Sequence, residues 1–313
     1  MRVSMVEEPG TDPRREPTMT VVAQEREQVV AGAIREISHI ATLPEITVKI
    51  VELVEDPKST AQDLDKVISA DPALCSRILK VVNSSFYGLP GQIASINRAI
   101  VMLGLNAVKN IAIAASLAKL FRGGDLTPNF SAKDLWTHSN ITAGASKMIA
   151  NSLKLGLADE AFLAGLIHDI GIMVEMQFDR PKLLDVLRRT GADAKGIPAS
   201  DMLNNEAAVY QATHQDFGAG LCEKWKFPKN FALVTGFHHD PMKLAAETRT
   251  LTAIVHVADR LAAETGMGFR QDIMNTSVDP AILDHLKMSA EKLAELKGLV
   301  QQQSADLAGL LAA

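Results

Sequence analysis

The adjacent residues His168 and Asp169 stand in an otherwise apolar run, 161–172, that has the composition of a buried helix. Burying an imidazole and a carboxyl group together costs free energy unless both find a partner. A metal ion is one such partner, and imidazole with carboxylate suits Mn, Fe, Co, Ni or Zn better than Ca or Mg. The plainer alternative is that His168 packs in a core and that Asp169 caps a helix.

Residues of the same two types recur on other apolar stretches of the chain. Adjacent helix positions point about 100° apart, so one His-Asp step cannot enclose an ion and other helices must supply ligands. His238 and His239 follow an apolar stretch, and Asp259 stands inside another at 254–260. The remaining candidates are His138, His214 and His256. Polar groups on otherwise apolar helices predict one shared interior site.

The composition of the 313-residue chain limits the classes of protein that it can represent. A net charge of −5 argues against bulk nucleic-acid binding, which usually needs a basic surface. The two cysteines, Cys75 and Cys222, stand in apolar helical contexts and favour a reducing compartment. We find no apolar run of about 20 residues, and the N-terminus is too polar for a signal peptide. These features predict a soluble, cytoplasmic protein without a membrane span.

The elements that would position the ligands are predicted to be helices. Aromatic residues make up 4% of the chain, Ala and Leu dominate, and strand signals are almost absent. The first 25 residues are charged and contain prolines, which predicts disorder, and helical periodicity runs over 22–42. Helix starts are predicted at the capping pattern of 59–63, at Pro72 after Asp71, and at Ser131 with Asp134. A change of composition at 122–128 predicts a boundary between two helical subdomains.

Together these motifs resemble the HDOD domain family over roughly residues 30 to 265. The first half carries Leu-Pro at 43–44, Ile-Ser-Ala-Asp-Pro-Ala-Leu at 68–74, Ile-Leu-Lys-Val-Val-Asn-Ser at 78–84, Tyr87, Ile-Asn-Arg-Ala-Ile at 96–100 and Leu-Gly at 103–104. The second half carries Phe-Leu-Ala-Gly-Leu-Ile-His-Asp-Ile-Gly at 162–171, Glu206, His-Gln-Asp-Phe-Gly at 214–218, Trp-Lys-Phe-Pro at 225–228 and His-His at 238–239. HDOD domains are similar to the HD phosphohydrolases and belong to bacterial signalling.

The resemblance implies an all-α fold of two helical subdomains, of which the C-terminal one is an HD-like helical core. Together with the composition of the chain, it predicts a disordered segment 1–25, an N-terminal helical part 26–124, an HD-like metal-site part 125–265 and a helical extension 266–313. By analogy with HD hydrolases, a first metal would be held by His138, His168, Asp169 and Asp259. Relatives with two metals imply His214, His238 and His239 as further ligands, with Asp169 as the bridge. The implied cofactor is one or two divalent transition-metal ions, such as Fe or Mn.

Two departures from the hydrolase pattern concern the handling of phosphate. Hydrolases that cleave cyclic dinucleotides carry a Gly-Tyr-Pro element after the His-His pair, and none follows His239 here. Many HD hydrolases place Lys directly after the His-Asp-x-Gly motif, where this chain has Ile172. A phosphate site needs cationic or amide donors. The nearby cations, Lys147, Arg180 and Arg260, are expected to be solvated surface charges.

Three functional hypotheses follow from these features. The first is a bacterial signal-transduction regulator or scaffold that retains a metal site and acts through binding of a signalling protein. The alternative is a metal-dependent phosphohydrolase that uses a metal-activated water. The third is a sensor that binds a nucleotide ligand without turnover.

Some residues have two plausible roles around such a site. Glu206 could orient His214 if one continuous helix carries both, and His256 is either a support for the ligands or a core histidine. Trp225 is expected in the core. The segment 83–85 is either a helix-terminating turn or a docking loop.

Overall fold

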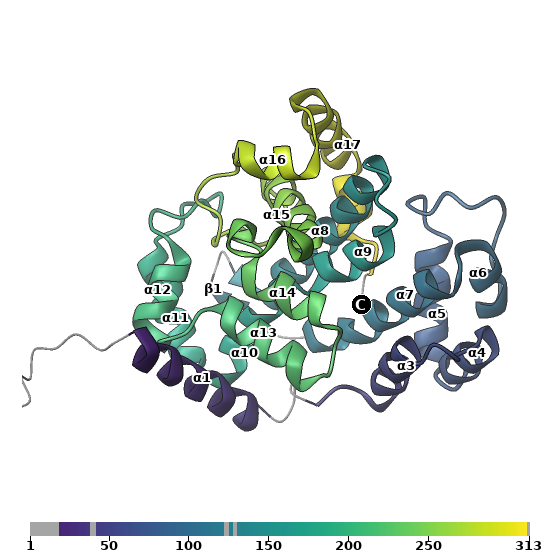
Figure 1. Cartoon of the computed structure of the whole chain (residues 1–313), viewed down its shortest axis with the longest axis horizontal. Helices are drawn as coiled ribbons and strands as arrows, with labels where there is room; N and C mark the ends of the chain where they lie inside the picture. The colour runs from purple at the N-terminus through teal and green to yellow at the C-terminus, as the bar shows by residue number, and fades with distance from the viewer. Residues whose placement is uncertain (1–18, 38–41, 122–124, 128–129, 312–313) are drawn as a thin grey trace, which may run out of the picture.

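The computed structural model describes residues 19–37, 42–121, 125–127 and 130–311, and these are almost entirely helical (Figure 1). The predicted all-α fold class is therefore confirmed. The helices are α1 (Met19–Glu36), α3 (Glu45–Glu55), α4 (Ala61–Ser69), α5 (Pro72–Val82), α6 (Ile96–Leu103), α7 (Leu105–Leu117), α8 (Ala132–Ser152), α9 (Ala158–Ile167), α10 (Ile170–Phe178), α11 (Arg180–Thr190), α12 (Met202–Tyr210), α13 (His214–Lys224), α14 (Lys229–Phe237), α15 (Ala246–Glu264), α16 (Pro280–Leu286) and α17 (Ala290–Ala308). Two short 3-10 helices, η1 (Ala118–Phe121) and η2 (Pro241–Lys243), and an antiparallel pair of strands, β1 (Asp125–Thr127) and β2 (Phe130–Ser131), complete the described elements.

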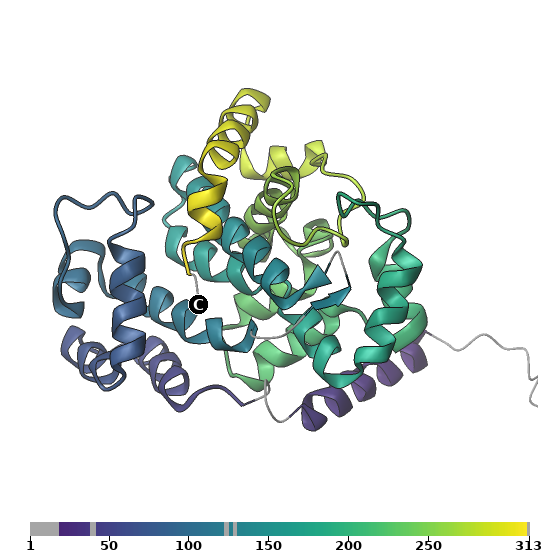
Figure 2. The same cartoon turned by 180° about the vertical axis from the view of Figure 1, so that it is seen from behind.

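The helices form two lobes that lie side by side (Figures 1 and 2). Helices α3 to α7 make the smaller lobe, and α8 to α15 make the larger one. The lobes are joined where α7 packs against α9. Strand β1 lies within the segment 122–128 where a boundary was predicted, and β2 follows it; residues 122–124 and 128–129 lie outside the described residues.

Helix α1 lies with the larger lobe, although its sequence precedes the smaller one (Figure 2). It packs against α10 and α13, and side-chain atoms of Val30 and Ile34 fill the space beside Gly220. The segment predicted to be disordered to residue 25 is helical from Met19 onward, which corrects that expectation. The charges of this segment suggested disorder. The helix is instead packed against α13, which is far away in the sequence and contacts its apolar face. Residues 1–18, and the end of the predicted helix at 38–41, lie outside the described residues.

Helix starts follow the predicted capping patterns. Thr60 and Asp63 form a capping box at the start of α4, in which each side chain accepts a hydrogen bond from the other residue's backbone N–H. Asp71 caps α5 with Pro72 as the first helical residue. Ser131 caps α8 by accepting from the backbone N–H of Asp134. The local signals therefore fix where these helices begin.

The segment 158–178, which spans α9 and α10, is long and apolar enough to cross a membrane by length and mean hydropathy alone. This corrects the expectation that no such run exists. However, 83% of its most apolar window is buried inside the protein, as in the core helices of soluble proteins. The segment is also not one continuous helix, because a turn at His168 and Asp169 separates α9 from α10. The segment is thus a core element of the larger lobe.

The C-terminal helices α16 and α17 pack against the larger lobe. Helix α17 lies against α8 and α15. The indole Nε1 of Trp136 donates a hydrogen bond to the carbonyl oxygen of Leu311 at 3.1 Å. Leu307 is fully buried, and its side chain fills the space where a Cβ on Gly144 would lie. The last helix of the predicted extension is therefore packed against α8, the helix that carries His138.

Candidate metal centre

The predicted ligands come from separate helices and meet at one interior point of the larger lobe. Their positions are His138 in α8, His168 and Asp169 between α9 and α10, His214 at the start of α13, His238 and His239 after α14, and Asp259 in α15. All of them are completely buried except His239, whose side chain is 9% exposed. The sequence-based expectation of one shared interior cluster is met by this arrangement.

The break between α9 and α10 lets His168 and Asp169 face the same interior. Asp169 occupies the N-cap position of α10, but its side chain makes no capping hydrogen bond. The simple capping role considered for Asp169 is therefore wrong. Gly171 brings the next element close, because a Cβ there would overlap the carbonyl oxygen of His214. The motif Asp-Ile-Gly thus packs α10 directly onto the start of α13.

One oxygen of Asp169 faces the first group of ligands. Asp169 Oδ2 lies 3.2 Å from His168 Nε2 and 3.9 Å from His138 Nε2. Asp259 Oδ1 lies 2.9 Å from His138 Nε2 and 3.5 Å from His168 Nε2. These four residues are the set that the resemblance implied for a first ion.

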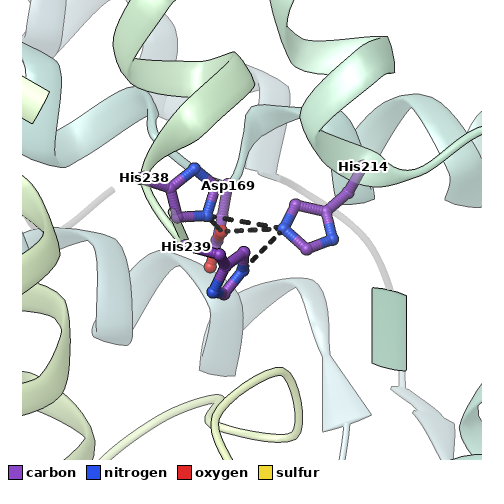
Figure 3. Close-up of side chains that lie close together, drawn as sticks. All are labelled: Asp169, His214, His238 and His239. Carbon is purple, nitrogen blue, oxygen red and sulfur yellow. Dashed lines mark hydrogen bonds and ion pairs between the residues drawn. The ribbon is translucent and has the colours of Figure 1, made fainter. Parts of the chain in front are cut away.

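The other oxygen of Asp169 faces the second group, shown in Figure 3. Asp169 Oδ1 lies 3.2 Å from His238 Nε2 and 3.7 Å from His214 Nε2. His239 Nε2 lies 3.1 Å from His214 Nε2. The Asp169 carboxylate stands between the two groups with one oxygen toward each, which is the placement that a bridging ligand requires.

Hydrogen bonds on the outer side of the His168 and His238 rings fix which nitrogen faces inward. The Nδ1 atom of His168 lies 2.8 Å from Gly165 O, and that of His238 lies 3.1 Å from Thr235 O. Since carbonyl oxygens only accept, each Nδ1 donates a proton outward, and each Nε2 is directed at the centre. Such outer acceptors are typical of metal-ligating histidines.

Glu206 provides the same support for His214. Its carboxylate accepts from the backbone N–H of His214 at 2.9 Å and lies 2.9 Å from His214 Nδ1. The predicted orienting contact is confirmed, but without a continuous helix. Gln211, at φ +63, ends α12 and turns the chain before α13 begins. A capping box at the start of α13 then places His214 beside Glu206.

The polar atoms that face the centre fit a bound cation. His168 Nε2, both Asp169 oxygens and Asp259 Oδ2 are buried without a hydrogen-bond partner among the described residues. Buried polar atoms are normally satisfied, so such a group of them calls for a missing partner. Two ligand atoms on one ion, each about 2.1 Å from it, are about 3–3.4 Å apart, close to the N···O separations found here. The donor set of imidazoles and carboxylates suits a divalent transition metal.

A comparison of the sequence with models of protein families identifies the family of the chain. A family model described as HDOD domain matches residues 40–241, well over half of the chain. The chain belongs to the HDOD domain family. The HDOD match ends just after η2 begins, so Asp259 and the last helices lie beyond it.

An uncharacterized protein of Treponema pallidum (strain Nichols) is 24% identical to this HDOD chain over 257 residues. The aligned part covers 82% of this chain and 48% of that protein. The chain therefore spans about half the length of the curated relative that it matches.

Solved structures at low identity share the fold. An HDOD domain protein of unknown function from Geobacter sulfurreducens has a TM-score of 0.76 at 19% identity, covering 92% of this chain and 98% of its own. A "putative phosphohydrolase" from Shewanella amazonensis SB2B has a TM-score of 0.70 at 22% identity, covering 90% and 98%. A "putative signal transduction protein" from Marinobacter aquaeolei VT8 has a TM-score of 0.72 at 22% identity, covering 93% and 66%. At these identities the likeness shows the HDOD fold alone.

Protonation in the HDOD centre is governed by burial and by neighbouring charges. Burial alone would raise the pKa of Asp169, but His168 and His238 outweigh it and hold that pKa well below its usual value. Burial would lower the pKa of His168, yet Asp169 raises it well above the ordinary value. Against the same effect of burial, Glu206 raises the pKa of His214 to about 9. An ion that binds here must therefore displace protons from imidazole rings.

Two of the three cations expected on the surface are instead largely buried. Lys147 pairs with Asp159 at 2.8 Å and lies over the ring of Tyr87. Arg260 lies 3.9 Å from Asp259, and its side chain is 13% exposed. The sequence shows where the two charged residues stand along their helices. It does not show which other parts of the chain pack over them. Arg180 is exposed, as expected.

The remaining residues singled out from the sequence have structural roles. His256 Nδ1 lies 2.7 Å from the carbonyl oxygen of His238, so this ring supports the backbone of a candidate ligand. Trp225 is buried, as predicted. Asn83 ends α5 and pairs with the backbone of Ile93, which favours the turn over the docking loop.

Sequence reasoning missed one carboxyl group beside the centre. Asp272, in the loop between α15 and α16, places Oδ2 3.5 Å from His239 Nε2. The signal that could have found it is an acidic residue between the apolar residues Phe269 and Ile273, both of which are buried.

Proposed function

We propose that this HDOD protein is a cytoplasmic signalling regulator that holds one or two divalent transition-metal ions and acts by binding a signalling protein. The observation that carries the proposal is a complete set of candidate ligands that is closed to solvent. Apart from the 9% exposed side chain of His239, the ligands are fully buried. An ion in such a site can hold α8, α10, α13 and α15 together, whereas a substrate phosphate has to reach it.

The residues of the chain would share the work of holding the ions. His138, His168 and Asp259 would bind one ion, and His214, His238 and His239 the other, with Asp169 between them. A divalent ion bound here would act as a Lewis acid and lower the pKa of a bound water. Glu206 and His256 would keep His214 and the backbone of His238 in place.

We place the partner contact on the smaller lobe, which is remote from the centre and carries much of the HDOD match. Helices α3 and α4 border an open groove of about 810 Å³. Its lining combines apolar side chains with charges of both signs: Glu45, Ile46, Lys49, Leu53, Asp56, Asp63, Lys66, Val67, Ala70 and Asp71. The likeness to the Marinobacter structure named for signal transduction supports a signalling partner.

The alternative proposal is a metal-dependent phosphohydrolase, which the intact ligand set and the name of the Shewanella structure favour. The surroundings of the centre count against it. Ile172 is fully buried and brings no charge where many HD hydrolases place Lys. After His239 the chain enters η2 without a Gly-Tyr-Pro element. Hydrolysis needs the phosphate held in line, and Arg260, the cation beside Asp259, is already bonded to the carbonyl oxygens of His256 and Ser277.

Metal analysis combined with a phosphodiesterase assay separates the two proposals. We expect the purified protein to contain a divalent transition metal and to give no multiple turnovers of cyclic di-GMP, followed as linear or monomeric product. His168→Ala is the matched control, because it damages the centre and leaves the smaller lobe intact. Metal-dependent turnover in the wild type that is lost in His168→Ala would instead establish the enzyme.

A further inference from the structure

The loop between α15 and α16 is buried over the candidate centre like a core element. Its buried residues are Phe269, Gln271, Asp272 and Ile273. The backbone N–H of Phe269 donates to the carbonyl oxygen of Asp134 in the first turn of α8 at 3.0 Å. Gly268 has φ +78, and a Cβ there would lie 2.7 Å from the backbone nitrogen of His138. The loop is therefore fixed against the helix that carries His138.

The carboxyl group of Asp272 points into the centre from this loop. Its side chain is completely buried, and Oδ2 lies 3.5 Å from His239 Nε2. Neither of its oxygens has a hydrogen-bond partner within the described part of the chain. Ligand atoms of His239, Asp259 and Asp272 all lie within 4.8 Å of one another. The three side chains are thus near enough to share one cation.

The local charge is unfavourable without such a cation. Asp272 is buried in the same cluster as the carboxylate of Asp259, and the ligand atoms of the two lie within 4.8 Å of each other. Arg260 is one nearby cation, but it approaches Asp259 at 3.9 Å and donates to the carbonyl oxygens of His256 and Ser277 at 3.3 Å. Buried carboxylates of like charge persist when a proton or a metal ion lies between them.

We propose that Asp272 is an additional metal ligand, which binds a divalent transition-metal ion together with His239 and Asp259. This inference rests on the proposed metal binding and adds a ligand from a loop outside the HDOD match at 40–241. His239 is the one candidate ligand with an exposed side-chain surface, and Asp272 adjoins it. The Asp272 carboxylate therefore occupies the side from which a phosphate would approach the ions. The protein supplies its own anion where an enzyme of this type would admit substrate.

Cobalt titration of the full-length protein tests the role of Asp272. The probe is Co²⁺ alone, with affinity and visible absorption as readouts, in the wild type, Asp272→Asn and Asp284→Asn. Asp284 is exposed on the neighbouring helix α16, so its variant removes an equal charge away from the centre. We expect Asp272→Asn to weaken Co²⁺ binding about tenfold or more and to change the spectrum, whereas Asp284→Asn matches the wild type. Asparagine keeps the size of the side chain, and a thermal melt verifies that each variant folds.

Inorganic phosphate provides a second readout on the Co²⁺-loaded proteins. We expect phosphate to leave the wild-type spectrum unchanged and to shift that of Asp272→Asn, because the variant frees a position for an anion. Wild-type affinity and spectrum in Asp272→Asn, with no response to phosphate, would overturn the role of Asp272 while leaving the metal centre standing. Absence of Co²⁺ binding in the wild type would overturn both this inference and the proposed function.

Discussion

Lys109 in the smaller lobe and Asp169 in the candidate centre are both buried, but only the lysine has hydrogen-bond partners for its charged group among the described residues. In the smaller lobe, the ammonium group of Lys109 donates to the carbonyl oxygen of Leu53 at 2.5 Å and to Ser59 Oγ at 2.6 Å. In the centre, Asp169 turns two oxygens toward imidazole rings without making a hydrogen bond. A satisfied buried charge has a structural explanation in its partners. When several side chains turn buried polar atoms without hydrogen-bond partners toward the same point, a bound ligand is the missing partner that they indicate.

The largest expected effect follows from removing the residue shared by both groups of ligands. Asp169→Ala should reduce metal affinity by about 100-fold or more, because one oxygen faces each group. Metal content and competition with a chelator measure the loss. His285→Ala is the control, since His285 lies on α16 and contacts Thr250 outside the centre. Equal metal retention in the two variants would contradict the assignment of the centre.

The protonated rings of the centre predict a dependence of metal binding on pH. The pKa of His168 is raised well above its ordinary value by Asp169, against burial, and that of His214 is raised to about 9 by Glu206, also against burial. Protons therefore compete with the metal across neutral pH, and affinity should rise about tenfold per pH unit for each proton displaced. Titrations between pH 6 and about 9 in weak buffer would show the released protons. An affinity that is flat over this range would show that these rings do not bind the ion.

Replacing Lys109, the hydrogen-bonded charge of the smaller lobe, should change the stability of the protein and leave metal binding unchanged. Lys109→Met leaves the carbonyl oxygen of Leu53 and the hydroxyl of Ser59 without their donor, which should lower the free energy of unfolding by about 1–3 kcal/mol. Metal content should not change, because the lysine lies in the other lobe. Chemical denaturation and metal analysis of the same preparation measure both. Loss of metal in a folded variant would show that the lobes are coupled.

The smallest effect concerns Glu175, a fully buried carboxyl group in α10 whose oxygens have no hydrogen-bond partner among the described residues. Burial, and then the charge of Glu206, raise its pKa well above 4.5. The unfolded chain ionises this group near 4.5, so its presence lowers stability as pH rises from there toward the folded-state pKa. Glu175→Gln should therefore raise the melting temperature by a few degrees at pH 7.5 and have little effect near pH 4.5. A lower melting temperature at pH 7.5 would show that the carboxylate is needed.

The sequence predicts the features that local chemistry determines. His168 and Asp169 are identifiable because such residues are costly on apolar helices, and the starts of α4, α5 and α8 follow from capping residues next to them. The sequence does not show which distant element covers a given face. For that reason the packing of α1 on α13, the burial of Arg260 and the approach of Asp272 to His239 were not predicted. Each of them depends on contacts between segments far apart in the chain.

The spread of the ligands along the chain has a consequence for synthesis. The candidate ligands begin at His138 and end at Asp259, and Asp272 follows later still. Contacts of such long sequence separation form late, because the intervening chain must be ordered first. A ribosome-bound chain that has exposed only the HDOD match lacks Asp259. With the proposed ligand set, tight capture of an ion is therefore delayed until α15 has emerged, and metal uptake would report that translation of the larger lobe is complete.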